Sequence, residues 1–79
     1  SAKAQSAFYD KLHEENFFTE AEEDIYHRGR NSDAGAVPKN TDAQTYRMST
    51  GFEAVLGALY LEGKQERIQE IWDKVRTLK

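Results

Sequence analysis

Residues 49–62, with the sequence STGFEAVLGALYLE, decide the fold expected for this chain. Their larger apolar side chains recur at spacings of three and four residues, at Phe52, Val55, Leu56, Leu59 and Tyr60. This spacing lines them along one side of an α-helix and predicts a helix with one buried face. Either Thr41 or Asp42 can cap its N-terminus, because both side chains accept hydrogen bonds from free backbone amides, and the pattern ends near Glu62.

Small residues interrupt the same predicted helix, at Gly51, Ala54, Gly57 and Ala58. Glycine within a helix is less favourable than alanine by about 1 kcal/mol, so it seldom occurs there without a packing reason. We therefore expect another helix to cross this one at close range.

Two helices are predicted upstream. The first covers residues 2–15 and has an apolar face formed by Ala4, Ala7, Phe8 and Leu12. Residues 16–18 (NFF) interrupt this pattern. Thr19 and Glu22 then have the spacing of a capping box, in which each side chain satisfies a backbone amide at the start of a helix. This second helix should end at about Arg28.

A final helix is expected after Gly63, which can adopt the positive φ that ends many helices. Its apolar stripe comprises Ile68, Ile71, Trp72, Val75 and Leu78, and we expect it to lie antiparallel to the helix before it. Residues 29–42 are rich in Gly, Asn and Ser and contain the only Pro, which predicts a loop. Loops of this length are often functional. The predicted fold class is all-α, with about four helices.

The composition indicates one small folded domain. The 79 residues are too few for a second domain, and the 38% of hydrophobic residues argue against disorder. The chain has no Cys, which removes disulfides and thiolate metal sites and favours a cytoplasmic protein. We expect no membrane partner, because no apolar run approaches the roughly 20 residues that span a bilayer, and no signal peptide is recognisable. The first residue is Ser1 rather than Met, so we expect further sequence upstream.

The charges are unevenly distributed along the chain. The net charge of −3 disfavours a general nucleic-acid binder. However, residues 1–24 contain two basic and seven acidic residues, whereas residues 25–47 contain four basic and two acidic ones. These central cations lie near amide side chains, in the set Arg28, Arg30, Asn31, Lys39, Asn40 and Arg47.

Guanidinium, ammonium and amide groups are the donors that bind the phosphates of a nucleic-acid backbone, so this set is a candidate anion-binding surface. A more ordinary interpretation of Arg28 and Arg30 also stays open, because cations near the C-terminal end of a helix stabilise its dipole.

Glu53 is a carboxylate in the middle of the apolar helix, on a face beside the main apolar stripe. A partly buried carboxylate is unfavourable unless it is paired or binds a metal. The residues alone leave two simpler alternatives open: an exposed side chain, or a salt bridge to Arg47 or Arg67. His13 and His27 lack the spacing of metal ligands, and we interpret both as surface residues.

Several motifs resemble the Mini-III ribonucleases in order and spacing. These proteins are compact relatives of ribonuclease III without a double-stranded-RNA-binding domain. The matching segments are residues 1–5 (SAKAQ), 17–20 (FFTE), 28–31 (RGRN), 38–42 (PKNTD), 44–47 (QTYR), 49–54 (STGFEA) and 56–62 (LGALYLE). The match is most specific in residues 28–31 and 46–61, and it covers nearly the whole chain.

This resemblance implies a helical fragment of a ribonuclease III-type endonuclease domain that is incomplete at its N-terminal side. A Gly-Asp-Ala signature helix, with another catalytic Asp and much of the dimer interface, would lie upstream. Glu53 would be a catalytic, metal-ligating carboxylate, and Mg²⁺ would be the cofactor for phosphodiester hydrolysis. Other ribonuclease III enzymes have an Asp three residues earlier, where this chain has Thr50, so further carboxylates must contribute to metal binding.

The resemblance also implies partners. The substrate would be double-stranded RNA, in particular the precursor of large-subunit ribosomal RNA in bacteria, and no DNA is expected. The protein would act as a homodimer in which two centres cut the two strands. The RNA-binding residues would come from the set Arg28, Arg30, Asn31, Lys39, Asn40 and Arg47.

Two functions of other classes stay open at this point. One is a noncatalytic RNA-binding or dimerisation module with the same fold. The other is a helical protein-interaction domain unrelated to RNA, whose contact surface would be the acidic first helix.

Overall fold

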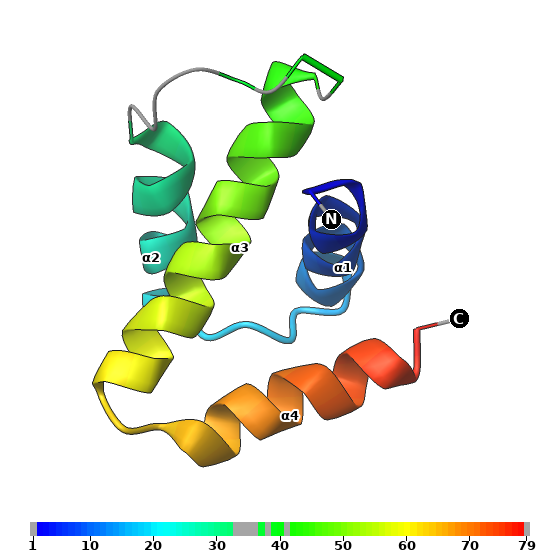
Figure 1. Cartoon of the computed structure of the whole chain (residues 1–79). Coiled ribbons are helices and arrows are strands. Elements are labelled where there is room, and N and C mark those ends of the chain that lie inside the picture. Colours follow the sequence, from blue (N-terminus) through cyan, green and yellow to red (C-terminus); the bar gives the residue numbers. More distant parts are fainter. Residues whose placement is uncertain (1, 33–36, 38, 41, 79) are drawn as a thin grey trace.

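The computed structural model describes residues 2–32, 37, 39–40 and 42–78, which form four helices. These are α1 (Ala2–Glu14), α2 (Glu20–Asn31), α3 (Ala43–Leu61) and α4 (Gln65–Arg76). The described part of the chain contains no strand, so the all-α prediction is confirmed. Helix α3 lies at the centre, with α1 and α2 on either side of it and α4 beyond its C-terminal end (Figure 1).

The predicted apolar stripe of α3 supplies much of the core. Phe52, Val55 and Leu59 are buried and Leu56 is partly buried, but Tyr60 is 66% exposed, so its place in the stripe was predicted wrongly. Burying each of the large apolar side chains stabilises the fold by about 1.5–3 kcal/mol. The other buried hydrophobic residues come from α1, the α1–α2 turn, α2 and α4, and are Tyr9, Leu12, Phe18, Tyr26, Ile71 and Val75.

Helix α1 buries a slightly different face from the predicted one. Leu12 is fully buried and Phe8 partly buried as expected, but Ala7 is exposed and Tyr9 is buried instead. The ring of Tyr9 stacks on that of Tyr26 from α2, with 3.5 Å between the ring centroids. This aromatic pair joins α1 to α2. Because Tyr9 packs against α2, the buried face of α1 includes residue 9 instead of residue 7.

Helix α2 continues through Asn31, three residues beyond its predicted end, so the expected start of the loop at Gly29 is wrong. A Cβ atom at Gly29 would lie only 2.6 Å from the Cβ of Ala54. A Cβ at Gly51 would likewise lie 2.7 Å from the ring of Tyr26. Gly29 therefore allows α2 to approach α3, and the predicted close crossing at Gly51 and Ala54 is confirmed.

Gly57 does not take part in this crossing, because a Cβ at that position would have no neighbour within 4 Å.

The helix ends follow the local sequence signals. The Thr19 and Glu22 capping box is present in full, and the side chain of Asp42 caps α3 by accepting a hydrogen bond from the amide of Thr45. Asn16 and Gly63 have positive φ values of 55° and 74° where α1 and α3 end. The alternative cap Thr41 and the predicted loop residues 33–36 and 38 lie outside the described residues.

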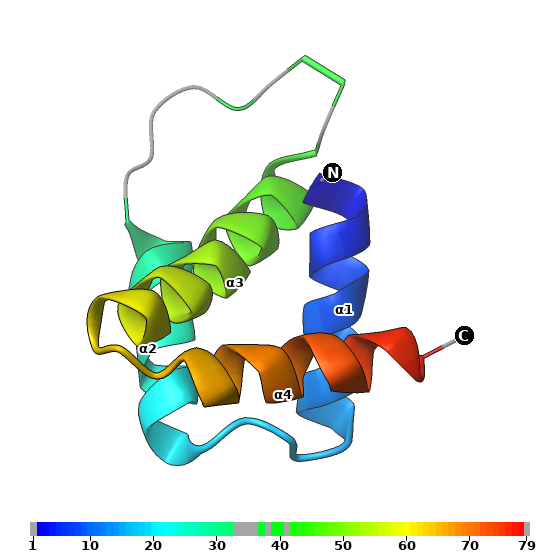
Figure 2. The same ribbon diagram turned by 60° about the horizontal axis from the view of Figure 1, so that its bottom comes forward.

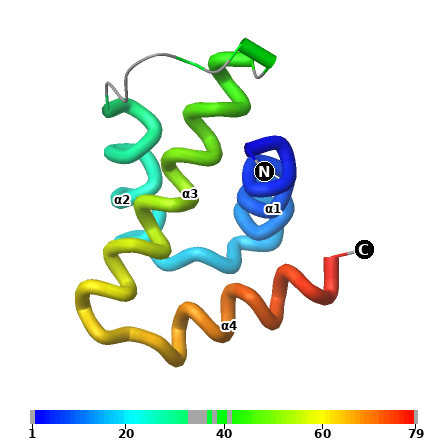
Figure 3. The backbone as a smooth tube through the Cα atoms, in the orientation of Figure 1, coloured from blue at the N-terminus to red at the C-terminus, as the bar shows by residue number. Residues whose placement is uncertain are grey.

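Helix α4 reverses the direction of the chain after Gly63, as expected, but it diverges from α3 instead of lying alongside it. It extends across to α1, so it contacts both helices (Figures 2 and 3). Its predicted stripe is nevertheless the face that packs: Ile71 and Val75 are buried, and Trp72 meets Phe52 edge to face, with 6.1 Å between the ring centroids. Helix α4 lies across the bundle because this position covers apolar residues of two helices rather than one.

Candidate active site

Glu53 lies on the exposed side of α3, which agrees with the alternative of an exposed side chain and not with that of a partly buried carboxylate. Gly57 and Tyr60, one and two turns further along the helix, are exposed as well. One oxygen of Glu53, Oε1, accepts a hydrogen bond of 3.3 Å from Nε2 of Gln5 on α1. The other oxygen, Oε2, accepts no hydrogen bond from the described residues. A cation in solvent can therefore reach the carboxylate.

The salt bridges considered for Glu53 are not formed within the described part of the chain. Arg67 lies on α4, where it donates to both carboxylate oxygens of Glu22 at 2.7 Å and to the carbonyl oxygen of Phe17 at 2.8 Å. Arg47 is exposed, and none of the ion pairs between described residues joins it to Glu53. The carboxylate of Glu53 therefore has no cationic partner among the described side chains.

Gln5 is set in place by a second contact with α3. Its carbonyl oxygen accepts a hydrogen bond from the hydroxyl of Ser49, which is only 5% exposed. Ser49 precedes Glu53 by four residues, so both side chains lie on the side of α3 that faces α1. The sequence contained no local signal for this contact, because Gln5 and Ser49 are 44 residues apart in the chain.

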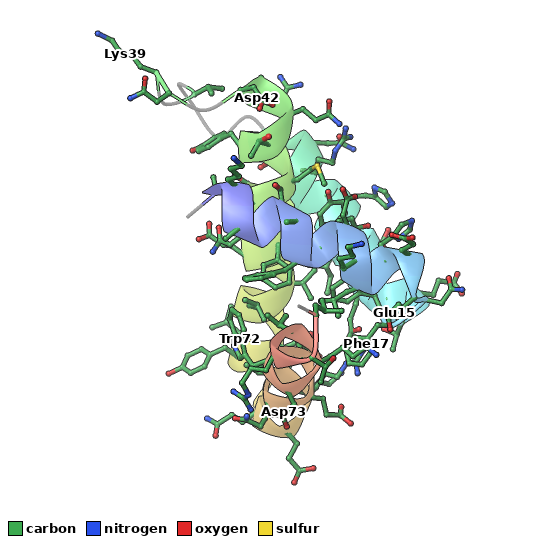
Figure 4. The ribbon with its side chains drawn as sticks, turned by 90° about the vertical axis from the view of Figure 1, so that its right-hand side faces the viewer. Glu15, Phe17, Lys39, Asp42, Trp72 and Asp73 are labelled. Carbon is green, nitrogen blue, oxygen red and sulfur yellow. The ribbon has the colours of Figure 1, made fainter. Side chains whose placement is uncertain are left out.

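The candidate RNA-binding residues gather at one end of the molecule. The C-terminal end of α2, which carries Arg28, Arg30 and Asn31, points to the same end of the bundle as the N-terminal end of α3, which carries Arg47 (Figure 1). Lys39 and Asn40 belong to the connection between these helix ends and are both exposed. Lys39 extends from the end of the molecule opposite Asp73 of α4 (Figure 4). The set expected from the sequence is therefore distributed over one end of the bundle, from the last turn of α2 through the connection to the start of α3.

Individual residues of this set differ in their surroundings. Arg28 is 79% exposed and forms an ion pair of 2.9 Å with Asp24 one turn earlier on α2. Arg28 and Arg30 lie in the last turn of α2, so the more ordinary interpretation, cations that stabilise the helix dipole, also stays open. Arg30 is partly buried, whereas Asn31 and Arg47 are exposed.

Glu53 and this basic end lie on different sides of α3. Helix α2 packs against Gly51 and Ala54, whereas Glu53 faces α1 through Gln5. Along the axis of α3, Glu53 is six residues beyond Arg47, which corresponds to about 9 Å at 1.5 Å per residue. Glu53 therefore lies further along α3 than Arg47 and faces α1, not α2.

A largely buried ion pair joins α2 to α4, and no local sequence pattern indicated it. Glu22 was expected to cap α2, which it does, but it also accepts both hydrogen bonds from Arg67. Burial raises the pKa of Glu22, but the hydrogen bonds from Arg67 and Thr19 outweigh burial and hold its pKa below the ordinary value. This pair is a structural contact, since its donors and acceptors are satisfied by one another and by Phe17 and Thr19.

Both histidines lie at the surface, as predicted. His13 has a partner that the sequence did not indicate, because its Nδ1 lies 2.6 Å from Oε2 of Glu23. The other oxygen of Glu23 accepts a hydrogen bond of 2.5 Å from the hydroxyl of Tyr9. Burial, followed by this hydrogen bond, raises the pKa of Tyr9 above its ordinary value. The hydroxyl of Tyr9 also lies 3.3 Å from Nδ1 of His13, one turn further along α1. In the sequence, the four-residue spacing of Tyr9 and His13 was a local pattern that could have indicated this cluster.

The described residues offer no complete metal centre, since no group of three or more His, Asp or Glu side chains among them is arranged to hold a metal ion. None of the helices seen in this part of the chain is long and apolar enough to cross a membrane.

Comparison with known proteins identifies the family of this helical domain. The ribonuclease III domain family matches residues 1–64. The match covers most of the 79 residues, and the chain therefore belongs to the ribonuclease III domain family.

The individual relatives are Mini-ribonuclease 3 proteins. The one from Staphylococcus aureus is 46% identical over 78 residues, which are 99% of this chain and 58% of the relative. The one from Streptococcus pneumoniae is 49% identical over 71 residues, which are 90% of this chain and 56% of the relative. The one from Thermosynechococcus vestitus is 46% identical over 71 residues, 90% of this chain and 44% of the relative. The resemblance seen in the motifs is confirmed, and the chain spans about half the length of these relatives.

Proposed function

We propose that the protein is an endoribonuclease that cleaves double-stranded or structured RNA by Mg²⁺-dependent hydrolysis of phosphodiester bonds. The observation that carries this proposal is the state of Glu53: an exposed carboxylate with one oxygen held by a neutral amide and no cationic partner among the described residues. Membership of the ribonuclease III domain family supports a nuclease.

Glu53 is suited to bind Mg²⁺. This ion prefers oxygen ligands, keeps several of its waters and is commonly held by only one or two carboxylates together with substrate phosphates. Bound Mg²⁺ would activate water as the nucleophile and stabilise negative charge on the phosphate. Glu53 would be one negatively charged ligand of this ion. In a protein of the relatives' length, further carboxylate ligands would come from residues outside these 79.

The basic end of the molecule would bind the RNA backbone. Arg28, Arg30 and Arg47 carry guanidinium groups that grip phosphate oxygens, Lys39 adds an ammonium group, and Asn31 and Asn40 donate from amides. These groups recognise the backbone rather than particular bases, which suits a duplex RNA substrate. We extend the proposal to a homodimer that matures large-subunit ribosomal RNA precursor, on the strength of the similarity to Mini-ribonuclease 3 proteins.

Replacement of the carboxylate by its amide tests the assignment of Glu53. Glu53→Gln keeps the size of the side chain but removes its charge. Lewis-acid stabilisation is worth several kcal/mol and each 1.36 kcal/mol changes a rate tenfold, so cleavage of a labelled RNA duplex should slow by about 100-fold or more. Binding of the duplex should be unchanged.

Glu66→Gln is the matched control, because Glu66 is an exposed carboxylate on α4. It should cut at the wild-type rate. Normal cutting by Glu53→Gln would show that Glu53 is not part of the active site.

A noncatalytic RNA-binding module is the second candidate, and one observation favours it: the described residues contain no complete group of metal ligands. Such a module would bind duplex RNA with an affinity that falls as salt is raised, because phosphate contacts release counterions. It would not cut the duplex at any Mg²⁺ concentration, whereas the endoribonuclease would.

A further inference from the structure

We propose that Gln5 is a positioning residue for Glu53: it holds the carboxylate by one oxygen and leaves the other oxygen available to a cation. This inference rests on the proposed function, in which Glu53 binds the metal. It concerns two residues that lie 48 positions apart in the sequence and meet only because α1 packs against α3.

Gln5 contacts two successive turns of α3. Its Nε2 donates to Oε1 of Glu53 at 3.3 Å, and its carbonyl oxygen accepts from the hydroxyl of Ser49. The amide therefore links a buried hydroxyl to an exposed carboxylate. Each end of the amide has one partner of matching hydrogen-bond character.

The charge of Glu53 determines which way the amide of Gln5 faces. An ionised carboxylate only accepts hydrogen bonds, so the NH₂ group of Gln5 must face it, and the carbonyl oxygen must then face Ser49. Ser49 can donate to this oxygen, and because it is only 5% exposed, water has little access to replace it. Ser49 thus fixes the amide, and the amide fixes the carboxylate.

A neutral donor has a particular consequence for cation binding. An Arg or Lys beside Glu53 would hold the carboxylate too, but it would also neutralise the charge and compete with an incoming metal ion. The amide of Gln5 restrains the carboxylate without a counter-charge. Residues that hydrogen-bond to metal ligands in this way orient the ligand, and their loss commonly weakens metal affinity or activity 10- to 100-fold.

The test uses Gln5→Met in the whole protein. Met has nearly the length of Gln and a similar helix propensity, but it forms neither hydrogen bond. The Mg²⁺ concentration for half-maximal cutting of duplex RNA should rise by about 10-fold, while KM for RNA at saturating Mg²⁺ stays the same. Ser49→Ala should shift the Mg²⁺ dependence in the same direction. Gln65→Met, at an exposed position on α4, is the control and should cut as the wild type does.

Cation binding without RNA provides a second measurement that does not depend on cutting. Mn²⁺ alone, bound at Glu53, should broaden the NMR signals of the Gln5 side-chain amide in the wild-type protein. It should not do so in Glu53→Gln. In Gln5→Met, broadening of the backbone amide of residue 53 should require about 10-fold more Mn²⁺.

The two measurements separate the possible results. An unchanged Mg²⁺ and Mn²⁺ dependence in Gln5→Met overturns the positioning role, as does a loss of RNA affinity with the cation dependence intact, because that would mean Gln5 merely joins α1 to α3. If Glu53→Gln cuts normally while Gln5→Met weakens Mn²⁺ binding, the proposed catalytic function fails and the positioning of Glu53 stands.

Discussion

A methyl group added at Gly51 tests how closely α2 packs against α3. In Gly51→Ala, the new Cβ atom would lie 2.7 Å from two ring carbons of Tyr26 and 2.8 Å from its carbonyl oxygen. Favourable contacts between carbon atoms lie at about 3.5–4.0 Å, so these positions clash. Tyr26 is only 3% exposed and stacks on Tyr9, and its carbonyl oxygen is part of the backbone of α2. The two helices must therefore move apart.

The size of the effect follows from two opposing terms. Overpacking a close contact destabilises a protein by about 1–3 kcal/mol, and the involvement of backbone places Gly51→Ala near the upper value. Replacing Gly by Ala within a helix stabilises it by about 1 kcal/mol. We expect a net destabilisation of about 2 kcal/mol. Gly57→Ala on the same helix should only stabilise the chain, by about 1 kcal/mol, because the new Cβ would have no neighbour within 4 Å.

Urea unfolding of the 79-residue chain, followed by circular dichroism, measures both variants. They should differ by about 3 kcal/mol, with Gly51→Ala less stable and Gly57→Ala more stable than the parent chain. Gly29→Ala should also be destabilised, because its Cβ would lie 2.6 Å from the Cβ of Ala54. Equal stability of Gly51→Ala and Gly57→Ala would refute the close crossing of α2 and α3.

Further predictions concern stability and its dependence on pH. Arg67→Met leaves the buried carboxylate of Glu22 without its cation and should destabilise the chain by about 3 kcal/mol in urea unfolding; a loss no larger than that of a surface ion pair would contradict the buried pair. The lowered pKa of Glu22 stabilises the fold above the ordinary value of 4.5, and this contribution is lost as the pH falls through the folded pKa, so Glu22→Gln should show a weaker loss of stability in acid. The pKa of Tyr9 is raised by burial and then by Glu23, so stability should fall above pH 10, where the unfolded chain releases the phenol proton and the folded chain does not. Tyr9→Phe should reduce that fall, and ionisation of Tyr9 near pH 10 in an ultraviolet titration would contradict it.

Removal of the α2 cap is a local test of the same kind. Thr19→Ala removes the hydroxyl that accepts a hydrogen bond from the amide of Glu22. The free energy of unfolding should fall by about 1 kcal/mol. Thr77→Ala is the control, because the hydroxyl of Thr77 donates to a carbonyl oxygen at an exposed helix end and caps no N-terminus. Equal unfolding midpoints for the two variants would show that the capping box adds little.

Features encoded within a few residues were predicted well. The spacing of Phe52, Val55 and Leu59 predicted α3 and its buried face, and the capping box at Thr19 and Glu22 predicted the start of α2. These signals act over one or two helical turns, so a short stretch of sequence contains all the atoms involved. The family resemblance likewise depended on short motifs, and the matching family confirms it.

Features that depend on how helices meet were predicted poorly. Gly29 looked like the start of a loop, yet it lies within α2, where the lack of a side chain allows α3 to approach closely. Tyr60 follows the apolar spacing but stays exposed, since none of the described helices covers that side of α3. The position of α4 across the bundle was equally absent from the local pattern.

The sequence by itself determined the four helices, the caps at the starts of α2 and α3, and the candidate carboxylate, because hydrogen bonds and side-chain spacing along one helix are local. Only the tertiary structure decided the partners: Gln5 for both Glu53 and Ser49, and Arg67 for Glu22. The two residues of each of these pairs lie 44 or more positions apart in the chain. Such contacts depend on which faces of the helices pack together, and the energy of burying those faces is shared by the whole fold rather than carried by any one segment.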